Sequence, residues 1–373
     1  MLLVIGAGPY GIATAALARE RGIETTVVGQ PLGFWYENMP EGMYLRSGPD
    51  WHLDAAGVHT FEAFLADRKI RAADVDPVPI GVFRDYAAWF QCEKGIDARP
   101  DLVKGLTRSN GGFEVEFEDG ARLTAEKVVA APGIRYFQQV PAWAASLPPD
   151  RARHTCDLVR FDDLDGARVL IVGGRQSAYE WAALAGEHGA ERVDIVHRHD
   201  VPRFGRVSWK FADPYVDNSR TIPGWWRNLD EAQRQAIDRE FWEAGRLTLE
   251  WWLTPRLAGD RFHRWPGNSV ESVRAEPGEP AQVALASHDV LTVDHIILAT
   301  GYRADLSRVP YLDGVLDEIR TEGGFPVLDP AFQSSVEGLY FPGFSATRDF
   351  GPFFGFTKGC PTAAALIVDD LCR

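Results

Sequence analysis

Residues 2–22 read LLVIGAGPYGIATAALARERG, and residues 25–29 read TTVVG. An apolar run, a glycine-rich turn, an alanine-rich stretch and a β-branched run follow one another within about 30 residues, the length of a βαβ unit. The sequence therefore predicts a strand, a helix and a parallel strand at the start of the chain.

The turn of this unit, GAGPYG at residues 6–11, is a GxGxxG motif. We expect Gly6 to permit the tight turn, Gly8 to let a pyrophosphate approach the backbone, and Gly11 to let the helix pack on the strand. The helix N-terminus then offers free N–H groups to phosphate. The acidic residue that usually contacts a ribose about 20 residues later is missing. Gln30 stands there instead, and its amide can bond to a ribose hydroxyl.

A second unit of the same order begins at Arg168 with RVLIVGGRQSAYEWAALAGEHGAERVDIVHR. In its turn, GGRQSA, Arg175 replaces the middle glycine of the motif. The guanidinium either crowds the pyrophosphate and impairs nicotinamide binding, or swings out and pairs with phosphate oxygens, which is what we expect. Arg198 follows the next strand, where a basic residue favours a 2′-phosphate and hence NADPH. Arg198 as an ordinary surface charge is the alternative.

The two halves of the chain repeat one order of elements. Residues 113–133 and 283–302 each read as a hairpin followed by a buried strand. We expect an α/β fold with two Rossmann-like domains, the first of them discontinuous (residues 1–150 and 291–373) around the second (151–290). Residues 201–265 hold seven of the twelve tryptophans and are expected to form a helical insertion in the second domain. Its segment 230–252 has a helical pattern, with Asp230 as N-cap.

Composition excludes several functional classes. The 373 residues are 45% apolar and 25% charged, which is ordinary for a globular protein. A net charge of −14 disfavours nucleic acid and anionic membrane partners. No apolar run approaches the roughly 18 residues of a membrane span, and the chain enters its first strand without an export signal, so we expect a cytoplasmic protein. The four cysteines form no CxxC pair and the histidines are scattered, so no metal site is expected.

Four motifs together carry a family resemblance: GAGPYG at 6–11, GGRQSAYE at 173–180, ATGY at 299–302 and GLYFPG at 338–343. In this order they resemble the flavoproteins with two dinucleotide-binding domains. Within these, the sequence is most similar to the flavin-dependent monooxygenases of the N-hydroxylating (lysine/ornithine) and FMO-like types. The resemblance implies FAD on the first glycine turn and NADPH on the second.

The resemblance also implies two sets of binding residues. For FAD these are Gly6, Gly8, Pro9, Tyr10, Gly11, Gln30, Trp35, Arg46, Ser47, His52, Pro132, Gly343, Arg348, Asp349, Phe353 and Thr362. For NADPH they are Gly173, Gly174, Arg175, Gln176, Ser177, Arg198, Thr300, Gly301 and Tyr302. Trp35 and residues 43–47 would lie beside the isoalloxazine, with His52 close by. An ordinary loop aromatic at Trp35 and a satisfied polar group at His52 are the alternatives.

Two further segments have open interpretations. Residues 347–356, TRDFGPFFGF, are expected to wrap the flavin, with Arg348 and Asp349 as an ion pair; a packing role without chemistry is the alternative. Cys360 begins the closing helix, and we expect a small buried residue there rather than a redox group. The backbone near Thr362 would stabilise charge on the reduced flavin. The tryptophans of the insertion form either a substrate wall or a subdomain core or homodimer interface.

The leading functional hypothesis is an FAD-dependent, NADPH-using monooxygenase that passes one oxygen atom of O₂ to a small molecule through a flavin C4a-peroxide. A reductase of the NAD(P)H:acceptor type is the second hypothesis, and a non-catalytic flavin-binding sensor is the third. The missing cysteine pair excludes a disulfide reductase of the usual kind, and no GxSxG or HExxH motif indicates a hydrolase. The sequence identifies no catalytic acid or base.

Overall fold

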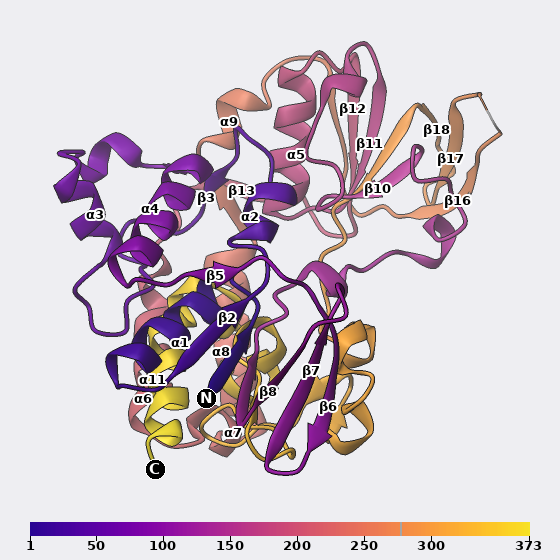
Figure 1. Cartoon of the computed structure of the whole chain (residues 1–373). Coiled ribbons are helices and arrows are strands. Elements are labelled where there is room, and N and C mark those ends of the chain that lie inside the picture. The colour runs from indigo at the N-terminus through magenta and orange to yellow at the C-terminus, as the bar shows by residue number, and fades with distance from the viewer. Residues whose placement is uncertain (277) are drawn as a thin grey trace.

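The computed structural model describes residues 1–276 and 278–373 and contains two five-stranded parallel sheets (Figure 1). The first sheet has, in spatial order, the strands β22 (Leu339–Tyr340), β9 (Lys127–Ala130), β1 (Leu2–Ile5), β2 (Thr25–Val28) and β5 (Ala98–Arg99). All four residues of β1 are buried, as expected for the centre of a parallel sheet that is covered on both faces.

The second sheet repeats this arrangement. Its strands are, in spatial order, β10 (Ala152–His154), β19 (His295–Leu298), β11 (Arg168–Val172), β12 (Arg192–Val196) and β15 (Phe262–Trp265). The predicted fold class, two Rossmann-like units in one α/β protein, is therefore confirmed. Strand β19, which follows residue 290, and strand β15, which ends at residue 265, both pair within this second sheet.

Alanine-rich helices follow the glycine turns. Helix α1 (Pro9–Glu20) follows β1, and α5 (Gln176–Glu187) follows β11. Helix α1 lies beside the closing helix α11 (Cys360–Leu371), and small buried residues on both helices allow this close approach. The first glycine turn is therefore held between the central strand and the last helix of the chain.

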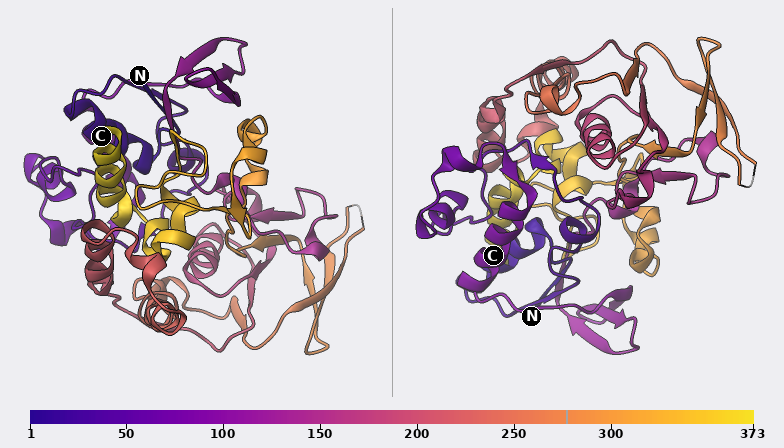
Figure 2. Two further views of the ribbon diagram at one scale, coloured as in Figure 1. Left: turned by 90° about the horizontal axis from the view of Figure 1, so that it is seen from below. Right: turned by 90° about the horizontal axis from the view of Figure 1, so that it is seen from above.

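Two antiparallel sheets project from the body of the molecule (Figure 2). Their strands are β6 (Val103–Ser109), β7 (Gly112–Phe117) and β8 (Arg122–Ala125) in one, and β16 (Val270–Arg274), β17 (Ala281–Leu285) and β18 (Val290–Val293) in the other. Both hairpins expected from the repeated pattern are present. In the first, the backbone N–H of Ala121 donates to Asp119 at 2.9 Å and closes the predicted turn.

The remaining elements of the first unit are further strands and helices. They are α2 (Gly33–Glu37), β3 (Tyr44–Leu45), α3 (Phe61–Asp67), β4 (Val78–Pro79), α4 (Ile80–Glu93), β20 (Thr321–Glu322), β21 (Phe325–Pro326) and α10 (Thr347–Phe350).

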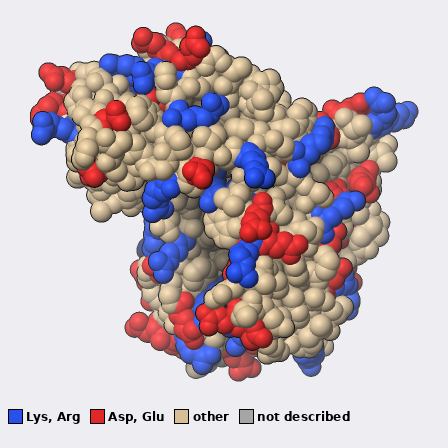
Figure 3. Space-filling model, turned by 180° about the vertical axis from the view of Figure 1, so that it is seen from behind, with Lys and Arg blue, Asp and Glu red and all other residues tan. Residues whose placement is uncertain are grey.

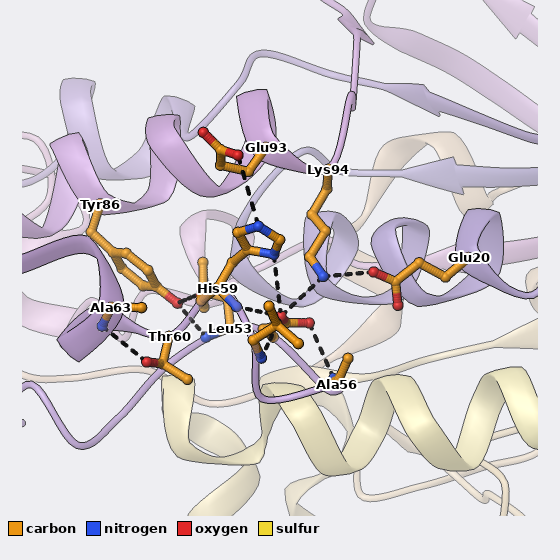
Figure 4. A network of polar contacts seen from close by, with 11 residues as sticks. Glu20, Leu53, Ala56, His59, Thr60, Ala63, Tyr86, Glu93 and Lys94 are labelled. Atoms are coloured by element: carbon orange, nitrogen blue, oxygen red, sulfur yellow. Dashed lines mark hydrogen bonds and ion pairs between the residues drawn. The ribbon is translucent and has the colours of Figure 1, made fainter. Parts of the chain in front are cut away.

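A buried polar network fixes the loop between β3 and α3 (Figure 4). The Asp54 carboxylate accepts backbone N–H groups of Ala56, Val58 and His59 at 2.7–3.1 Å. It also forms an ion pair of 2.9 Å with Lys94, which follows α4 and donates to Glu20 of α1 at 2.6 Å. Both side chains of the Asp54–Lys94 pair are almost fully buried (3% and 5% exposed). The network therefore connects the loop to two helices.

The Trp-rich insertion consists of short elements. They are β13 (Arg203–Gly205), α6 (Asp213–Thr221), α7 (Trp225–Asn228), α8 (Glu231–Glu240), the π-helical turn Phe241–Arg246, β14 (Thr248–Glu250) and α9 (Leu253–Arg256). Asp230 caps α8 as predicted, in a reciprocal pair with Gln233.

The prediction of a helix as far as residue 252 was wrong. Helical structure ends with the π-helical turn, and residues 248–250 form β14, which pairs in parallel with β13. Gly245 lies in that turn, and a Cβ there would meet the Trp209 ring at 2.6 Å. The chain therefore leaves the helix where a tertiary contact, not the local pattern, decides its path.

The insertion packs on the first unit although it is inserted in the second. Helix α6 lies beside α11, and α7 lies beside α10. We call the buried hydrophobic group that joins these parts the aromatic cluster: Trp51, Trp209, Ala212, Val216, Trp226, Ile237, Phe241 and Phe353. The Trp226 Nε1–H also donates to the Arg348 carbonyl at 3.1 Å. The two units are thus connected by packing as well as by the chain.

Candidate functional site

A cavity of about 1360 Å³ contains both glycine turns. Its lining includes the residues that follow the carboxyl ends of β1, β2, β9 and β22 in one sheet and of β11, β12 and β19 in the other. This is the edge at which open parallel sheets bind ligands. Figure 3 shows a hollow between the upper and lower parts of one face of the molecule, with Lys and Arg side chains beside it.

The first glycine turn has the geometry of a phosphate cradle. Gly6 has a φ of +107°, and a Cβ there would overlap the carbonyl oxygen of Ala131. A Cβ on Gly11 would overlap the carbonyl oxygen of Gly6, so α1 could not approach the turn. Nothing lies within 4 Å of the Cβ position of Gly8, which is the N-cap of α1 and carries no capping side chain. The turn therefore leaves open space at a helix N-terminus, where a pyrophosphate fits.

Most residues predicted to contact FAD line the cavity. They are Gly6, Gly8, Pro9, Tyr10, Gly11, Gln30, Trp35, Arg46, Ser47, Pro132 and Gly343. Trp35 packs against Phe83 with ring centroids 4.3 Å apart, and this contact fixes the indole at the cavity wall.

Five predicted residues lie elsewhere. His52 and Thr362 line a separate pocket of about 460 Å³, and burial lowers the pKa of His52. Arg348 and Asp349 form the predicted ion pair at 2.9 Å, and Asp349 also accepts the Leu328 N–H at 2.7 Å, but neither residue lines the cavity. Phe353 belongs to the aromatic cluster. None of these five side chains lines the large cavity.

Residues 347–356, which we call the tail loop, reach the cavity through other side chains, Thr347 and Phe356 among them. The Tyr10 hydroxyl lies 2.7 Å from the carbonyl oxygens of both Phe354 and Phe356, so its proton bonds to either one. Burial raises the pKa of Tyr10, which keeps the hydroxyl a donor. Tyr10 therefore connects the first glycine turn to the tail loop. The GxGxxG pattern leaves that position unspecified, so no sequence signal indicates this role.

Cys360 is fully buried at the start of α11, and this confirms the interpretation as a buried residue. Burial raises the pKa of its thiol, so the thiol stays protonated although it lies at a helix N-terminus, where a dipole can favour a thiolate.

All residues predicted to contact NADPH line the cavity: Gly173, Gly174, Arg175, Gln176, Ser177, Arg198, Thr300, Gly301 and Tyr302. Gly173 has a φ of +141°, and a Cβ there would overlap the carbonyl oxygen of Ala299, as at Gly6 in the first turn.

Arg175 is the N-cap of α5 and directs its guanidinium out of the turn. The Arg175 Cζ lies 4.6 Å from the centre of the Trp242 ring, and its Nη1 lies 3.4 Å from the carbonyl oxygen of Arg246. Within residues 1–276 and 278–373 it forms no ion pair with a carboxylate. The guanidinium therefore leaves the helix N-terminus free while its charge stays at the cavity.

Two polar groups beside the cavity lay outside any sequence motif. Arg46 forms an ion pair of 2.9 Å with Glu250 of β14 and thereby joins the first unit to the insertion. The His154 Nδ1 lies 3.2 Å from the Cys156 Sγ, but burial raises the pKa of Cys156 to about 12, so the thiol stays protonated. Neither pair has a characteristic sequence spacing.

The tryptophans of the insertion divide between both interpretations. Trp209 and Trp242 line the cavity. Trp226 belongs to the aromatic cluster, and Trp252 is buried against the second sheet. In the part of the chain that the structure describes, no cysteine lines the cavity, and no group of three or more His, Cys, Asp or Glu side chains is placed to hold a metal ion. None of the helices there is both long and apolar enough to cross a membrane.

Known proteins share this fold. A family model described as pyridine nucleotide-disulphide oxidoreductase matches residues 3–208. The FAD-dependent urate hydroxylase of Xanthomonas campestris is 31% identical over 231 residues, 55% of this chain and 47% of the relative. The probable indole-3-pyruvate monooxygenase YUCCA8 of Arabidopsis thaliana is 25% identical over 92% of this chain and 84% of its own. The chain spans about half the length of the first curated relatives it matches.

Among solved structures, the ornithine hydroxylase of Pseudomonas aeruginosa superimposes with a TM-score of 0.79 and 20% identity, over 99% of this chain and 98% of that one. This likeness confirms, for the fold, the resemblance that the four motifs carry. Because the family model matches more than half of the sequence, including both glycine turns, the chain belongs to the pyridine nucleotide-disulphide oxidoreductase family.

Proposed function

We propose that this protein is an FAD-dependent, NADPH-using monooxygenase that oxygenates a small molecule. The observation that carries the proposal is the single cavity lined by both glycine turns, in which two dinucleotides would meet. The lining holds no cysteine among the described residues, so a cysteine pair is not available as electron acceptor. The urate hydroxylase, the probable indole-3-pyruvate monooxygenase and the ornithine hydroxylase that this chain resembles support the same class.

The residues present fit FAD on the first turn. Gly8 and the N-terminus of α1 would bind the pyrophosphate, and the Gln30 amide would bond to a ribose hydroxyl. Trp35 and Arg46, which line the same cavity, would hold the ring system. When bound, the flavin accepts hydride and supplies the oxygen chemistry, while the protein orients it and excludes water.

The second turn fits NADPH. The N-terminus of α5 and the Arg175 guanidinium would bind the pyrophosphate, and the exposed Arg198 would bind the 2′-phosphate. Thr300 and Tyr302 line the same cavity and would position the nicotinamide. Trp209 and Trp242 cover the same space and would exclude water from it.

Anaerobic reduction of the purified yellow protein, followed by admission of air, tests this proposal. We expect NADPH to bleach the flavin absorbance faster than NADH does. On mixing with O₂ in a stopped-flow instrument, we expect a transient spectrum that belongs to neither the oxidised nor the reduced flavin. Anaerobic reduction of a quinone or dye without such a transient would instead establish the acceptor reductase. A flavin bleached by neither nucleotide would establish the sensor.

Arg175→Ala is expected to raise the dissociation constant for NADPH by about 10- to 100-fold, because a hydrogen bond to a charged group contributes about 1.5–3 kcal/mol and 1.4 kcal/mol is tenfold. The concentration dependence of anaerobic flavin reduction measures this constant. The exposed Arg274→Ala on β16 is the matched control and should leave it unchanged. Tighter NADPH binding by Arg175→Ala would show that the side chain obstructs the nucleotide.

A further inference from the structure

Three arginine side chains meet at one part of the cavity wall. Arg46 comes from the loop after β3, Arg175 from the second glycine turn and Arg246 from the π-helical turn of the insertion. All three line the cavity. Burial, together with the positive charges of Arg46 and Arg175, lowers the pKa of Arg246 to about 10. The three guanidinium groups therefore lie close enough to repel one another.

One carboxylate serves this cluster directly. Glu250, which is 3% exposed, pairs with Arg46 at 2.9 Å. Glu180 also lines the cavity, but Arg256 holds its carboxylate at 2.6 Å. The charge of Arg46 is balanced by Glu250, whereas those of Arg175 and Arg246 have no balancing carboxylate in the described chain.

Among the three arginines, Arg246 has the fewest polar partners within the protein. Its Nε is buried and has no hydrogen-bond partner, and across residues 1–276 and 278–373 no ion pair reaches the guanidinium. It is held instead by the faces of two rings, with its Cζ 5.3 Å from the centre of Phe241 and 5.1 Å from that of Phe356. A buried charge without a partner is costly, so the Arg246 guanidinium favours an anionic ligand at this place.

Aromatic side chains surround the same place. The centre of the Trp209 ring lies 5.0 Å from the Arg46 Cζ, and the centre of the Trp242 ring lies 4.6 Å from the Arg175 Cζ. The centroids of Trp209 and Phe356 are 5.5 Å apart, and both residues line the cavity with Trp242. Rings stack on aromatic walls, and a guanidinium binds a carboxylate through two parallel hydrogen bonds. The wall therefore suits a ligand with an aromatic ring and one acidic group.

We propose that the site selects an aromatic carboxylic acid as substrate, with the carboxylate on Arg246 and the ring against Trp209 and Phe356. This assignment rests on the proposed function, because it names the substrate class of the same cavity. Arg175 is the N-cap of α5 and would serve the nucleotide, whereas Arg246 lies in the π-helical turn of the insertion. The same anion chemistry is offered by the NADPH phosphates, so the experiment must separate the two sources.

Equilibrium binding to the flavin-loaded protein, without NADPH, tests the assignment. The probes are phenylacetate, its neutral amide phenylacetamide, and the non-aromatic cyclohexylacetate, and the signals are flavin absorbance and tryptophan fluorescence. We expect phenylacetate to bind at least about tenfold more tightly than phenylacetamide, as a charged hydrogen bond implies. We also expect it to bind more tightly than cyclohexylacetate. Equal affinities for phenylacetate and its amide in the parent protein would overturn the proposal.

Variants of Arg246 assign the preference to this side chain. Arg246→Gln should bring the ratio between phenylacetate and phenylacetamide close to one, and Arg246→Lys, which keeps the charge, should retain most of it. The exposed Arg274→Gln is the matched control and should keep the full ratio. Flavin content and circular dichroism verify that each variant is folded. If Arg246→Gln keeps the ratio, the carboxylate assignment is wrong.

Titration of NADPH into the same variants separates the two anion sources. We expect Arg246→Gln to leave NADPH affinity within about threefold of the parent, far below the tenfold effect of a lost charged hydrogen bond. A large loss of NADPH affinity with an unchanged carboxylate preference would assign Arg246 to the nucleotide phosphate and overturn the proposal. Because these titrations need no turnover, they report on the carboxylate site even if NADPH fails to reduce the flavin, which is the failure of the proposed function.

Discussion

Gly11→Ala is expected to yield a protein that carries no flavin and unfolds at a much lower denaturant concentration than the parent. A Cβ at this position would overlap the carbonyl oxygen of Gly6 and lie 3.2 Å from Val4 in the central strand. Helix α1 would have to move away from β1, and the phosphate cradle would open. Overpacking against a backbone that cannot yield costs about 3 kcal/mol or more, a large part of a typical 5–15 kcal/mol. Urea titration and the flavin content of the purified protein measure both effects.

Two glycine variants serve as controls for this prediction. Gly81→Ala in α4 has no atom within 4 Å of the new Cβ and should leave stability equal or slightly higher. Gly8→Ala also meets no protein atom, so it should fold, yet its Cβ would enter the space that the pyrophosphate needs. We expect a stable but largely colourless protein. A yellow Gly11→Ala protein of normal stability would contradict the packing argument.

Asp54→Asn should lower the free energy of unfolding at pH 7 by about 3 kcal/mol, the lower end of the range for breaking a buried ion pair, because Lys94 keeps Glu20 as a partner. The carboxylate also loses its charged hydrogen bonds to the backbone of the loop before α3. Asp74→Asn, in the exposed pair with Arg71, is the control and should leave the free energy of unfolding nearly unchanged.

The effect of Asp54→Asn should depend on pH with a definite sign. Burial by itself raises the pKa of Asp54, but the backbone donors and Lys94 outweigh it, so the pKa is lowered. A carboxylate with a lowered pKa stabilises the folded state above its unfolded pKa of about 3.9, and this stability is lost as the pH falls through the folded pKa. The difference between parent and variant should therefore be constant from about pH 5 to 8 and shrink below about pH 4. Urea titrations at several pH values measure it, and a difference that grows in acid would contradict the network.

The parts of the fold that follow from local rules were predictable. The glycine turns were recognised because Gly6 and Gly173 must have positive φ and must admit a neighbouring carbonyl, and no other residue meets both demands. The cap at Asp230 was equally local. Strand β14 was missed because its pairing with β13 is tertiary. The sheet that β19 joins was not predictable either, because the sequence of a strand carries no mark of its partner strands.

The site was predictable where the backbone of the glycine turns lines the cavity. It was less predictable where side chains from other segments line it. All residues placed on the second turn line the cavity. In the tail loop, the ion pair of Arg348 and Asp349 was correctly predicted. Asp349 also accepts the Leu328 N–H, and no sequence spacing predicts this contact. Arg246 lies in no motif, since only the fold brings it beside Arg46 and Arg175.

The aromatic cluster has a consequence for how the molecule comes apart. Trp226 and Phe241 belong to the insertion in the second half of the molecule, yet they are buried with Trp51 and Phe353 of the first half. Neither half can lose its structure without exposing the rings that the other has covered. The two halves should therefore melt as one cooperative unit rather than as independent foldons.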